Sequence, residues 1–455
     1  FDNRYLLDAN MGYNGSEQFS PKNRFGFFPS FAVGWVVSNE NFLKGNKVIT
    51  NLKLRASYGK VGSDKIGNNR FLYLSNHTYS SSGGVAVGGY GTINENRPGN
   101  YNLQWEVSKK QNYGIDLQLW SDWSITFDYF IEQRSKILKT QGMAPQFAGV
   151  PQWPYLNLGV VDNSGYELEI NYNKSFNKDL FLSVKGNFSY NHNKVKFWDE
   201  VPYADGYYYQ YRTTGQSLNQ TFGYKIDWSN GNGYFNTQEE LDKYTEGYVD
   251  ENGVEHKGIT YNLSTAPQLG DFKYIDQNGD GIIDEKDRVP IGYTNVPRVS
   301  YGLNVSLNYK WFDFTVFLQG VGKYSSYYSG QGVNENIYQG TFFKYHKTAW
   351  TAERYAAGQK ITYPRLSTGE TCSKIENDFF VMDRAFIRLK AIELGYTLPS
   401  NALRAIGINK LRVYFRGDNL VTWDRLRTNS TDPEQTDQIG YPIVKTFNFG
   451  FNVTF

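Results

Sequence analysis

The chain has 455 residues, one Cys, 17% aromatic residues, and 47 Lys and Arg against 45 Asp and Glu. Its mean hydropathy of −0.58 and lack of a long apolar run exclude a bundle of transmembrane helices. The aromatic content excludes a mainly disordered chain, the net charge of +2 gives no sign of a nucleic-acid partner, and a single Cys excludes an internal disulfide framework. A large all-β protein remains.

Alternation of apolar and polar residues with a period of two starts near Phe1 and dominates the chain. Between residues 4 and 15, for example, Tyr5, Leu7, Met11 and Tyr13 share one face of the expected strand. The same pattern predicts twelve long strands, which in chain order are 4–15, 26–37, 50–61, 105–119, 123–135, 162–174, 180–193, 299–310, 312–320, 386–398, 411–420 and 447–455.

Several of these apolar faces are aliphatic in the middle and aromatic at both ends. The distance from Tyr5 to Tyr13 is roughly 26 Å along a strand, which at a tilt of about 40° spans roughly 20 Å. Outer-membrane barrels have an apolar band about 25 Å tall between two aromatic girdles. A soluble sandwich is the alternative, but it has no reason to place Tyr at both ends of a buried face. The pattern therefore favours a transmembrane antiparallel β-barrel.

The connections between strands alternate between short and long. Short turns are expected at 121–122, 176–178 and 310–311, and the long polar stretches are 62–104, 136–158, 194–298 and 321–380. Outer-membrane barrels have short periplasmic turns and long extracellular loops. Strands of a barrel run alternately up and down, and short turns must all lie at one end. Counting from both ends of the chain meets this condition only if 194–298 contains either no membrane-spanning strand or two of them. Thr221–Trp228 looks like a single strand, so we place it within an extracellular excursion.

One motif is sharp. Residues 276–287 follow the D-x-N-x-D-G-x-I-x-x-x-D form of a calcium loop, in which Gly281 permits the sharp turn. The predicted calcium ligands are side-chain oxygens, one backbone carbonyl (Ile282) and one water-mediated contact (Asp284), in the order Asp276, Asn278, Asp280, Ile282, Asp284 and Asp287. Asp287 replaces the usual Glu at position twelve, and an Asx-rich turn without metal is the alternative. We expect a structural ion that ties down the excursion.

Other candidate residues carry little signal. The four His residues are isolated and have no metal-ligand spacing: His77, His192, His256 and His346. No nucleophile elbow, phosphate-binding loop or zinc-protease motif is present, so no enzyme is predicted. The cluster 207–209 and Trp153 are interpreted either as sugar-stacking or as loop-packing aromatics, and Cys372 as an incidental loop thiol.

The chain resembles SusC-like TonB-dependent transporters of Bacteroidetes outer membranes. The resemblance rests on stretches that follow one another in this order: Phe25-Gly26-Phe27-Phe28-Pro29-Ser30, Leu54-Arg55-Ala56-Ser57-Tyr58-Gly59, Asn102-Leu103-Gln104-Trp105-Glu106, Asn163-Ser164-Gly165-Tyr166-Glu167, Phe222-Gly223-Tyr224-Lys225, the calcium loop, Tyr363-Pro364-Arg365-Leu366, Phe386-Ile387-Arg388-Leu389-Lys390, Leu394-Gly395-Tyr396-Thr397-Leu398-Pro399 and the Phe-rich end at Phe455.

The resemblance implies a 22-stranded outer-membrane barrel that is filled by an N-terminal plug, energised through TonB and capped by a SusD-like surface lipoprotein. Such transporters import oligosaccharides or, in some members, peptides. Residues 1–455 would form about twelve C-terminal strands, with the plug and the other strands lying outside this chain. A complete twelve-stranded barrel is an alternative. The rival functions are a structural or assembly role in a surface complex, and a calcium-stabilised adhesin. No substrate-binding residue is predicted.

Overall fold

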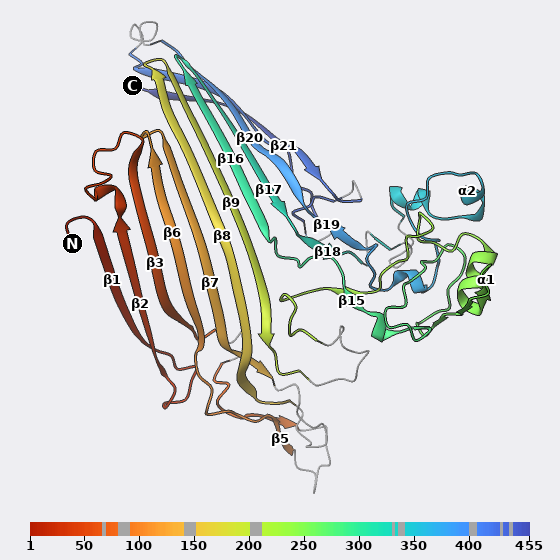
Figure 1. Ribbon diagram of the computed structural model, residues 1–455. Coiled ribbons are helices and arrows are strands. Elements are labelled where there is room, and N and C mark those ends of the chain that lie inside the picture. Colours follow the sequence, from red (N-terminus) through yellow and green to blue (C-terminus); the bar gives the residue numbers. More distant parts are fainter. Residues whose placement is uncertain are drawn as a thin grey trace.

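The computed structural model describes residues 1–65, 70–80, 92–140, 152–200, 212–329, 333–334, 342–399, 407–427, 431–435 and 440–455. Its main element is a twelve-stranded antiparallel sheet (Figure 1). In order across the sheet, the strands are β1 (Tyr5–Gly15), β2 (Phe25–Val36), β3 (Ile49–Ser63), β6 (Glu106–Leu119), β7 (Trp123–Thr140), β8 (Tyr155–Asn177), β9 (Leu180–Phe197), β16 (Val299–Tyr309), β17 (Phe312–Gly322), β20 (Phe386–Thr397), β21 (Lys410–Asp424) and β22 (Thr446–Thr454).

Shorter elements occupy the connections. They are β4 (Asn76–Ser80), β5 (Thr92–Arg97), β10 (Phe222–Gly223), α1 (Gln238–Glu246), β11 (Gly247–Val249), β12 (Glu255–Lys257), β13 (Thr260–Tyr261), β14 (Ile282–Ile283), β15 (Val289–Pro290), β18 (Ser325–Tyr327), α2 (Ala352–Ala356) and β19 (Val381–Asp383), together with 3₁₀ turns at Val37–Asn39, Glu285–Asp287, Lys344–Thr348 and Cys372–Lys374. Within the described residues, no helix is both long and apolar enough to cross a membrane.

All twelve predicted strands are confirmed, each paired with its predicted neighbour along the chain. Several of them are longer than the alternation indicated, most of all β7 and β8. β7 continues to Thr140, while β8 begins at Tyr155 and ends at Asn177. Backbone pairing between β7 and β8 continues past the end of the clear alternation, through two register shifts. It can do so because the hydrogen bonds between strands join backbone groups and do not depend on alternating apolar and polar side chains. The two ends of the stretch 136–158, at 136–140 and 155–158, are therefore strand, although the stretch was predicted as a loop.

The register brings the apolar faces of successive strands together. Tyr5 lies opposite Trp35 at one end of the β1–β2 pair, and Tyr13 lies opposite Phe27 at the other. In the middle of the sheet, Val305 lies between Val184 and Val316 on the two neighbouring strands. Directly opposite residues share a face, so the sheet presents one continuous apolar face edged by aromatic rings, as outer-membrane barrels do.

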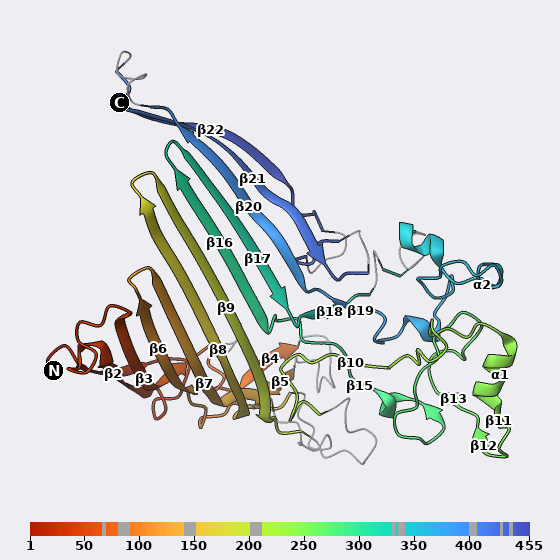
Figure 2. The same cartoon turned by 45° about the horizontal axis from the view of Figure 1, so that its top comes forward.

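The connections separate by length between the two ends of the sheet. Short turns join β6 to β7, β8 to β9 and β16 to β17 at one end, which we call the turn end. The long connections between β3 and β6, β9 and β16, and β17 and β20 all leave from the other end, the loop end, where Figures 1 and 2 show α1, α2 and the small strands beside the sheet. In the described residues, 194–298 contributes only the end of β9 to the main sheet. The up-and-down alternation of the strands is therefore the one predicted for an excursion without a spanning strand.

The largest buried cluster lies in the long connections and not against the sheet. It joins residues of 224–283 to residues of 328–382, among them Phe235, Phe272 and Phe380, which are fully or almost fully buried. We call the described parts of 221–291 and 324–382 the excursion unit. These stretches were predicted to be polar loops, and their average composition is polar. Scattered aromatic residues that are far apart in sequence nevertheless form a core of their own, because the apolar face of the sheet points outward.

Candidate functional site

The polar face of the sheet carries two charged clusters. Arg55 of β3 donates to Asp116 of β6 (Nε–Oδ2 3.2 Å) and to Asp128 of β7 (Nη2–Oδ2 2.6 Å). Arg412 of β21 bridges Asp313 and Glu393 on the next two strands of the sheet. Ion pairs between neighbouring strands on one face are compatible with a watery lumen and not with lipid. This face is therefore suited to line an aqueous interior.

The excursion unit is held together by a buried asparagine. Asn377 is fully buried, and its Nδ2 donates to the Tyr274 hydroxyl (3.1 Å) and to the backbone oxygens of Ser373 (3.1 Å) and Ile375 (3.0 Å). Its Oδ1 accepts the backbone N–H groups of residues 379 and 380. Because the amide is fully satisfied, it fixes the chain that presents Phe379 and Phe380 to the core.

The predicted calcium loop is folded as a turn of interlocking carboxylates. Asp276 accepts the N–H groups of Gly279 (2.7 Å) and Gly281 (2.8 Å). Asp280 accepts the N–H of Ile282, and Asn278 accepts the N–H of Asp280, both at 2.9 Å. Gly281 has φ of +82°, a left-handed conformation that favours glycine. These bonds order the loop.

The end of the loop is buried. Asp287 is fully buried, and its carboxylate accepts the N–H of Gln277 (2.7 Å) and of Asp284 (2.8 Å). Burial raises the pKa of Asp287, and the nearby charges of Asp276 and Asp284 raise it further. Ile283 within the loop is also buried, in the excursion core. The loop is thus attached to that core.

The donor chemistry fits calcium, since every predicted ligand is an oxygen and a buried carboxylate among like charges favours a cation. In the described part of the chain, however, no three His, Cys, Asp or Glu side chains converge as a group that could hold a metal ion. Lys286 instead lies near two of the acids, with its Nζ 3.6 Å from Asp280 and 3.8 Å from Asp284. Calcium stays a proposal.

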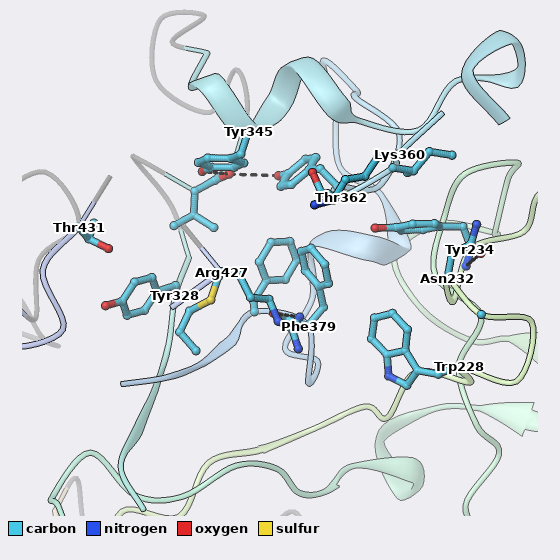
Figure 3. A pocket seen from close by; sticks show the side chains of 16 residues that line it. Trp228, Asn232, Tyr234, Tyr328, Tyr345, Lys360, Thr362, Phe379, Arg427 and Thr431 are labelled. Atoms are coloured by element: carbon cyan, nitrogen blue, oxygen red, sulfur yellow. Dashed lines mark hydrogen bonds between the residues drawn. The ribbon is translucent and has the colours of Figure 1, made fainter. Parts of the chain in front are cut away.

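A cavity of about 650 Å³ opens in the excursion unit and was not predicted (Figure 3). Seven of its lining residues are aromatic, among them Trp228, Tyr234, Tyr345 and Phe379. They come from the connections β9–β16 and β17–β20, and Arg427 joins them from just beyond β21. Among these aromatic lining residues, Tyr363 belongs to the stretch 363–366, which contributed to the family resemblance. The resemblance assigned that stretch no function.

The remaining candidates are scattered. Cys372 is fully buried in the excursion core, where burial raises its thiol pKa, so it is a core residue. His346 is also buried, accepting the Phe343 N–H through Nδ1 at 3.0 Å, whereas His77 and His256 are exposed. Trp153 is half-buried just before β8, and the cluster 207–209 lies outside the described residues.

These features define an outer-membrane β-barrel wall, with an apolar outer face, a charged inner face and long connections at one end. Residues 1–264 match the family described as TonB dependent receptor-like, beta-barrel. The chain belongs to this family, whose members are outer-membrane proteins.

Curated relatives agree. TonB-dependent receptor P3 of Formosa agariphila is 29% identical over the whole chain and 44% of its own length. TonB-dependent receptor SusC of Bacteroides thetaiotaomicron is 28% identical over the whole chain and 42% of its own length. The SusC-like resemblance is confirmed. The chain spans less than half the length of these relatives.

Solved structures show the same fold. The RagAB peptide transporter matches the whole chain with a TM-score of 0.73, at 20% identity and over 46% of that protein's chain. The RagAB peptide importer in its "open-open" state gives a TM-score of 0.72 at the same identity. At this identity the likeness shows the fold alone.

Proposed function

We propose that this chain forms part of the barrel wall of a SusC-like importer. The importer would move oligosaccharides or peptides across the outer membrane with a SusD-like lipoprotein and TonB. The observation that carries the proposal is the two-sided sheet: Val184, Val305 and Val316 align on an apolar face, while Arg55 and Arg412 hold ion pairs on the polar one. A wall of this kind separates lipid from an aqueous path.

The sheet has two open edges. β1 pairs only with β2, and β22 pairs only with β21 in the described chain. Unpaired strand edges are not tolerated in lipid, and the relatives are more than twice as long as this chain. We propose that about ten further strands close the barrel to 22 and that a plug fills it, both supplied by the remaining polypeptide.

The orientation follows from the lengths of the connections. We propose that the turn end faces the periplasm and that the excursion unit lies outside the cell, where it would contact the SusD-like lipoprotein. The two stretches 194–298 and 321–380 would then be extracellular. Extracellular fluid is rich in calcium, so the ion is available to the loop 276–287.

We propose that calcium binds this loop through Asp276, Asn278, Asp280, Ile282, Asp284 and Asp287. Its charge would offset the repulsion among the carboxylates around buried Asp287, with Lys286 moving away from Asp280 and Asp284. Because Ile283 packs in the excursion core, the ion would stabilise that core. This is a structural role.

Calcium is expected to stabilise the excursion unit by about 2.7 kcal/mol when its free concentration is about 100 times Kd. The measurement is the thermal midpoint of the purified full-length protein in calcium and in chelator. The difference should disappear in the double variant Asp276→Ala, Asp280→Ala and persist in Glu251→Gln, an exposed acid of the same unit. An equal calcium shift in parent and double variant would argue against a filled site.

The pH dependence of this effect has a definite sign. Because the pKa of Asp287 is raised in the folded protein, ionisation of Asp287 destabilises the calcium-free fold, and that loss is relieved as pH falls through the raised pKa. Calcium needs ionised ligands, so its stabilisation should shrink over the same range. The thermal midpoints measured in calcium and in chelator should therefore approach each other as the pH is lowered.

Transport is tested by deleting the gene for the full-length protein in its host. We expect loss of growth on, or uptake of, one class of oligosaccharide or peptide, with recovery on complementation. If the deletion strain takes up every tested substrate normally but loses a surface complex, the transport function is wrong and the structural or assembly role is favoured. Release of the protein from membranes without detergent would favour an adhesin.

A further inference from the structure

The cavity in the excursion unit has rigid walls. Tyr234 stacks on Phe272, with ring centroids 5.1 Å apart and an angle of 24° between the planes. Phe379 packs on the same Phe272 at 4.9 Å. The hydroxyls of Tyr345 and Tyr363 both donate to the backbone oxygen of Val333, at 2.8 and 3.1 Å. Aromatic faces held in this way are preorganised, which lowers the entropy cost of binding.

A glycine turn shapes one side of the cavity. Gly231 and Gly233 have φ of +90° and +74°, conformations that other residues rarely adopt. A Cβ at Gly233 would lie 2.6 Å from Ile226 and 3.1 Å from Trp228. The side chain of Asn230 closes the turn by donating to the Tyr234 backbone oxygen at 2.8 Å. The turn thus sets Trp228 and Tyr234 on one wall, with the Tyr234 hydroxyl directed into the cavity (Figure 3).

The charged side chains that line the cavity have one sign, although Asp378 lies next to the lining residue Phe379, where the nearby Arg427 partly offsets the burial that raises the pKa of Asp378. The lining includes Arg427 and Lys360 and no Asp or Glu. Arg427 donates to the Phe379 backbone oxygen at 3.0 Å, and its guanidinium carbon lies 5.1 Å from the centre of the Phe379 ring. Within the described residues, neither cation forms an ion pair shorter than 4 Å. Lys360 is exposed and lies at the rim.

Resting on the import function proposed above, we propose that this cavity binds a carboxylate-bearing sugar residue of an oligosaccharide. The C–H face of a pyranose ring would pack on aromatic rings such as Trp228, whose faces are negative. The Tyr234 hydroxyl supplies a hydrogen-bonding group for a sugar hydroxyl. Asn232 and Thr362 also line the cavity, and each already has a hydrogen bond within the protein, to Asn236 and Thr348, so each has only its remaining bonding capacity to offer. Arg427 supplies the charge for the carboxylate, to which a guanidinium can donate two parallel hydrogen bonds.

A peptide fits the same cavity less well. A free peptide carries an ammonium group, and among the described lining residues no carboxylate is present to meet it. Peptides also bind commonly as an added strand along a sheet edge, whereas the polar groups here belong mainly to side chains. Hydroxyl and amide groups between aromatic faces suit a ring with several hydroxyls.

The test uses the purified full-length protein in detergent and isothermal calorimetry. The probes are a trimer of galacturonic acid, the neutral trisaccharide maltotriose and the tripeptide Gly-Leu-Phe. We expect the acidic trimer to bind at least tenfold more tightly than either of the others. Arg427→Gln should weaken the acidic trimer at least tenfold, while Arg425→Gln, an exposed neighbour outside the cavity, should leave it unchanged.

A second variant separates binding from folding. Lys360→Gln changes only an exposed rim residue and should weaken the acidic trimer twofold to fivefold with an unchanged thermal midpoint. Tighter binding of the peptide or the neutral sugar, or no cavity-dependent binding of any probe, would overturn the proposal. Because binding is measured without a membrane, a protein that binds but does not import would contradict the transport function alone.

Discussion

Replacing Asn377 with alanine is expected to open the excursion unit while leaving the twelve-stranded sheet folded. The change leaves two buried N–H groups, at residues 379 and 380, without their present partner, whereas the Tyr274 hydroxyl keeps its bond to the Cys372 backbone oxygen. Each unsatisfied buried group costs about 1–3 kcal/mol, so a total of about 3 kcal/mol or more is expected. The loss should be local, because the core of this unit is separate from the sheet.

Hydrogen exchange of the backbone amides checks this result. Protection at Phe272, Phe379 and Phe380 should fall at least 100-fold, whereas protection in β8 and β9 should not change. Asn252→Ala is the matched control, because Asn252 is exposed in a turn of the same excursion. Equal protection in the variant and the parent would show that the asparagine network does not hold the unit.

Replacing Arg388 with methionine is expected to release the connection between β21 and β22. Arg388 lies in β20 with its side chain 1% exposed. It donates to Asp432 at 2.5 and 2.6 Å, to Glu434, and to the Thr422 hydroxyl at 2.9 Å. Removing one partner of a buried pair leaves the other charges uncompensated and costs about 3 kcal/mol.

Limited proteolysis of the folded protein measures the release. Cleavage within 425–445 should become at least tenfold faster in Arg388→Met, and adding Asp432→Asn with Glu434→Gln should restore most of the protection, because the uncompensated charges are then gone. Arg425→Gln is the control, since its pair with Asp383 is exposed and such pairs contribute less than about 1 kcal/mol. If Arg388→Met and Arg425→Gln are cleaved at the same rate, the buried pair does not hold this connection.

The sequence determined the sheet. Alternation such as Tyr5, Leu7, Met11 and Tyr13 is a local property, because successive side chains of a strand point to opposite faces whatever surrounds it. With short turns fixing which strands are neighbours, the number of strands, their order and their apolar face all followed. The calcium-loop motif was likewise readable from local spacing, and its glycine conformation agrees at Gly281, although calcium itself stays a proposal.

The tertiary structure decided what the long connections do. The N–H of Ile226 donates to Asp378, 152 residues away, and the N–H of Phe272 to Ser373, 101 residues away. Residues that come together only after the chain has folded leave no periodic pattern in the sequence. The polar average composition of these stretches therefore gave no indication of an aromatic core or of its cavity. The stretch around Arg388 was predicted as a strand, 386–398, and also by resemblance, but neither gave Arg388 a partner. Its partner Asp432 could be identified only in three dimensions, because a charge pair depends on where two distant segments come to lie.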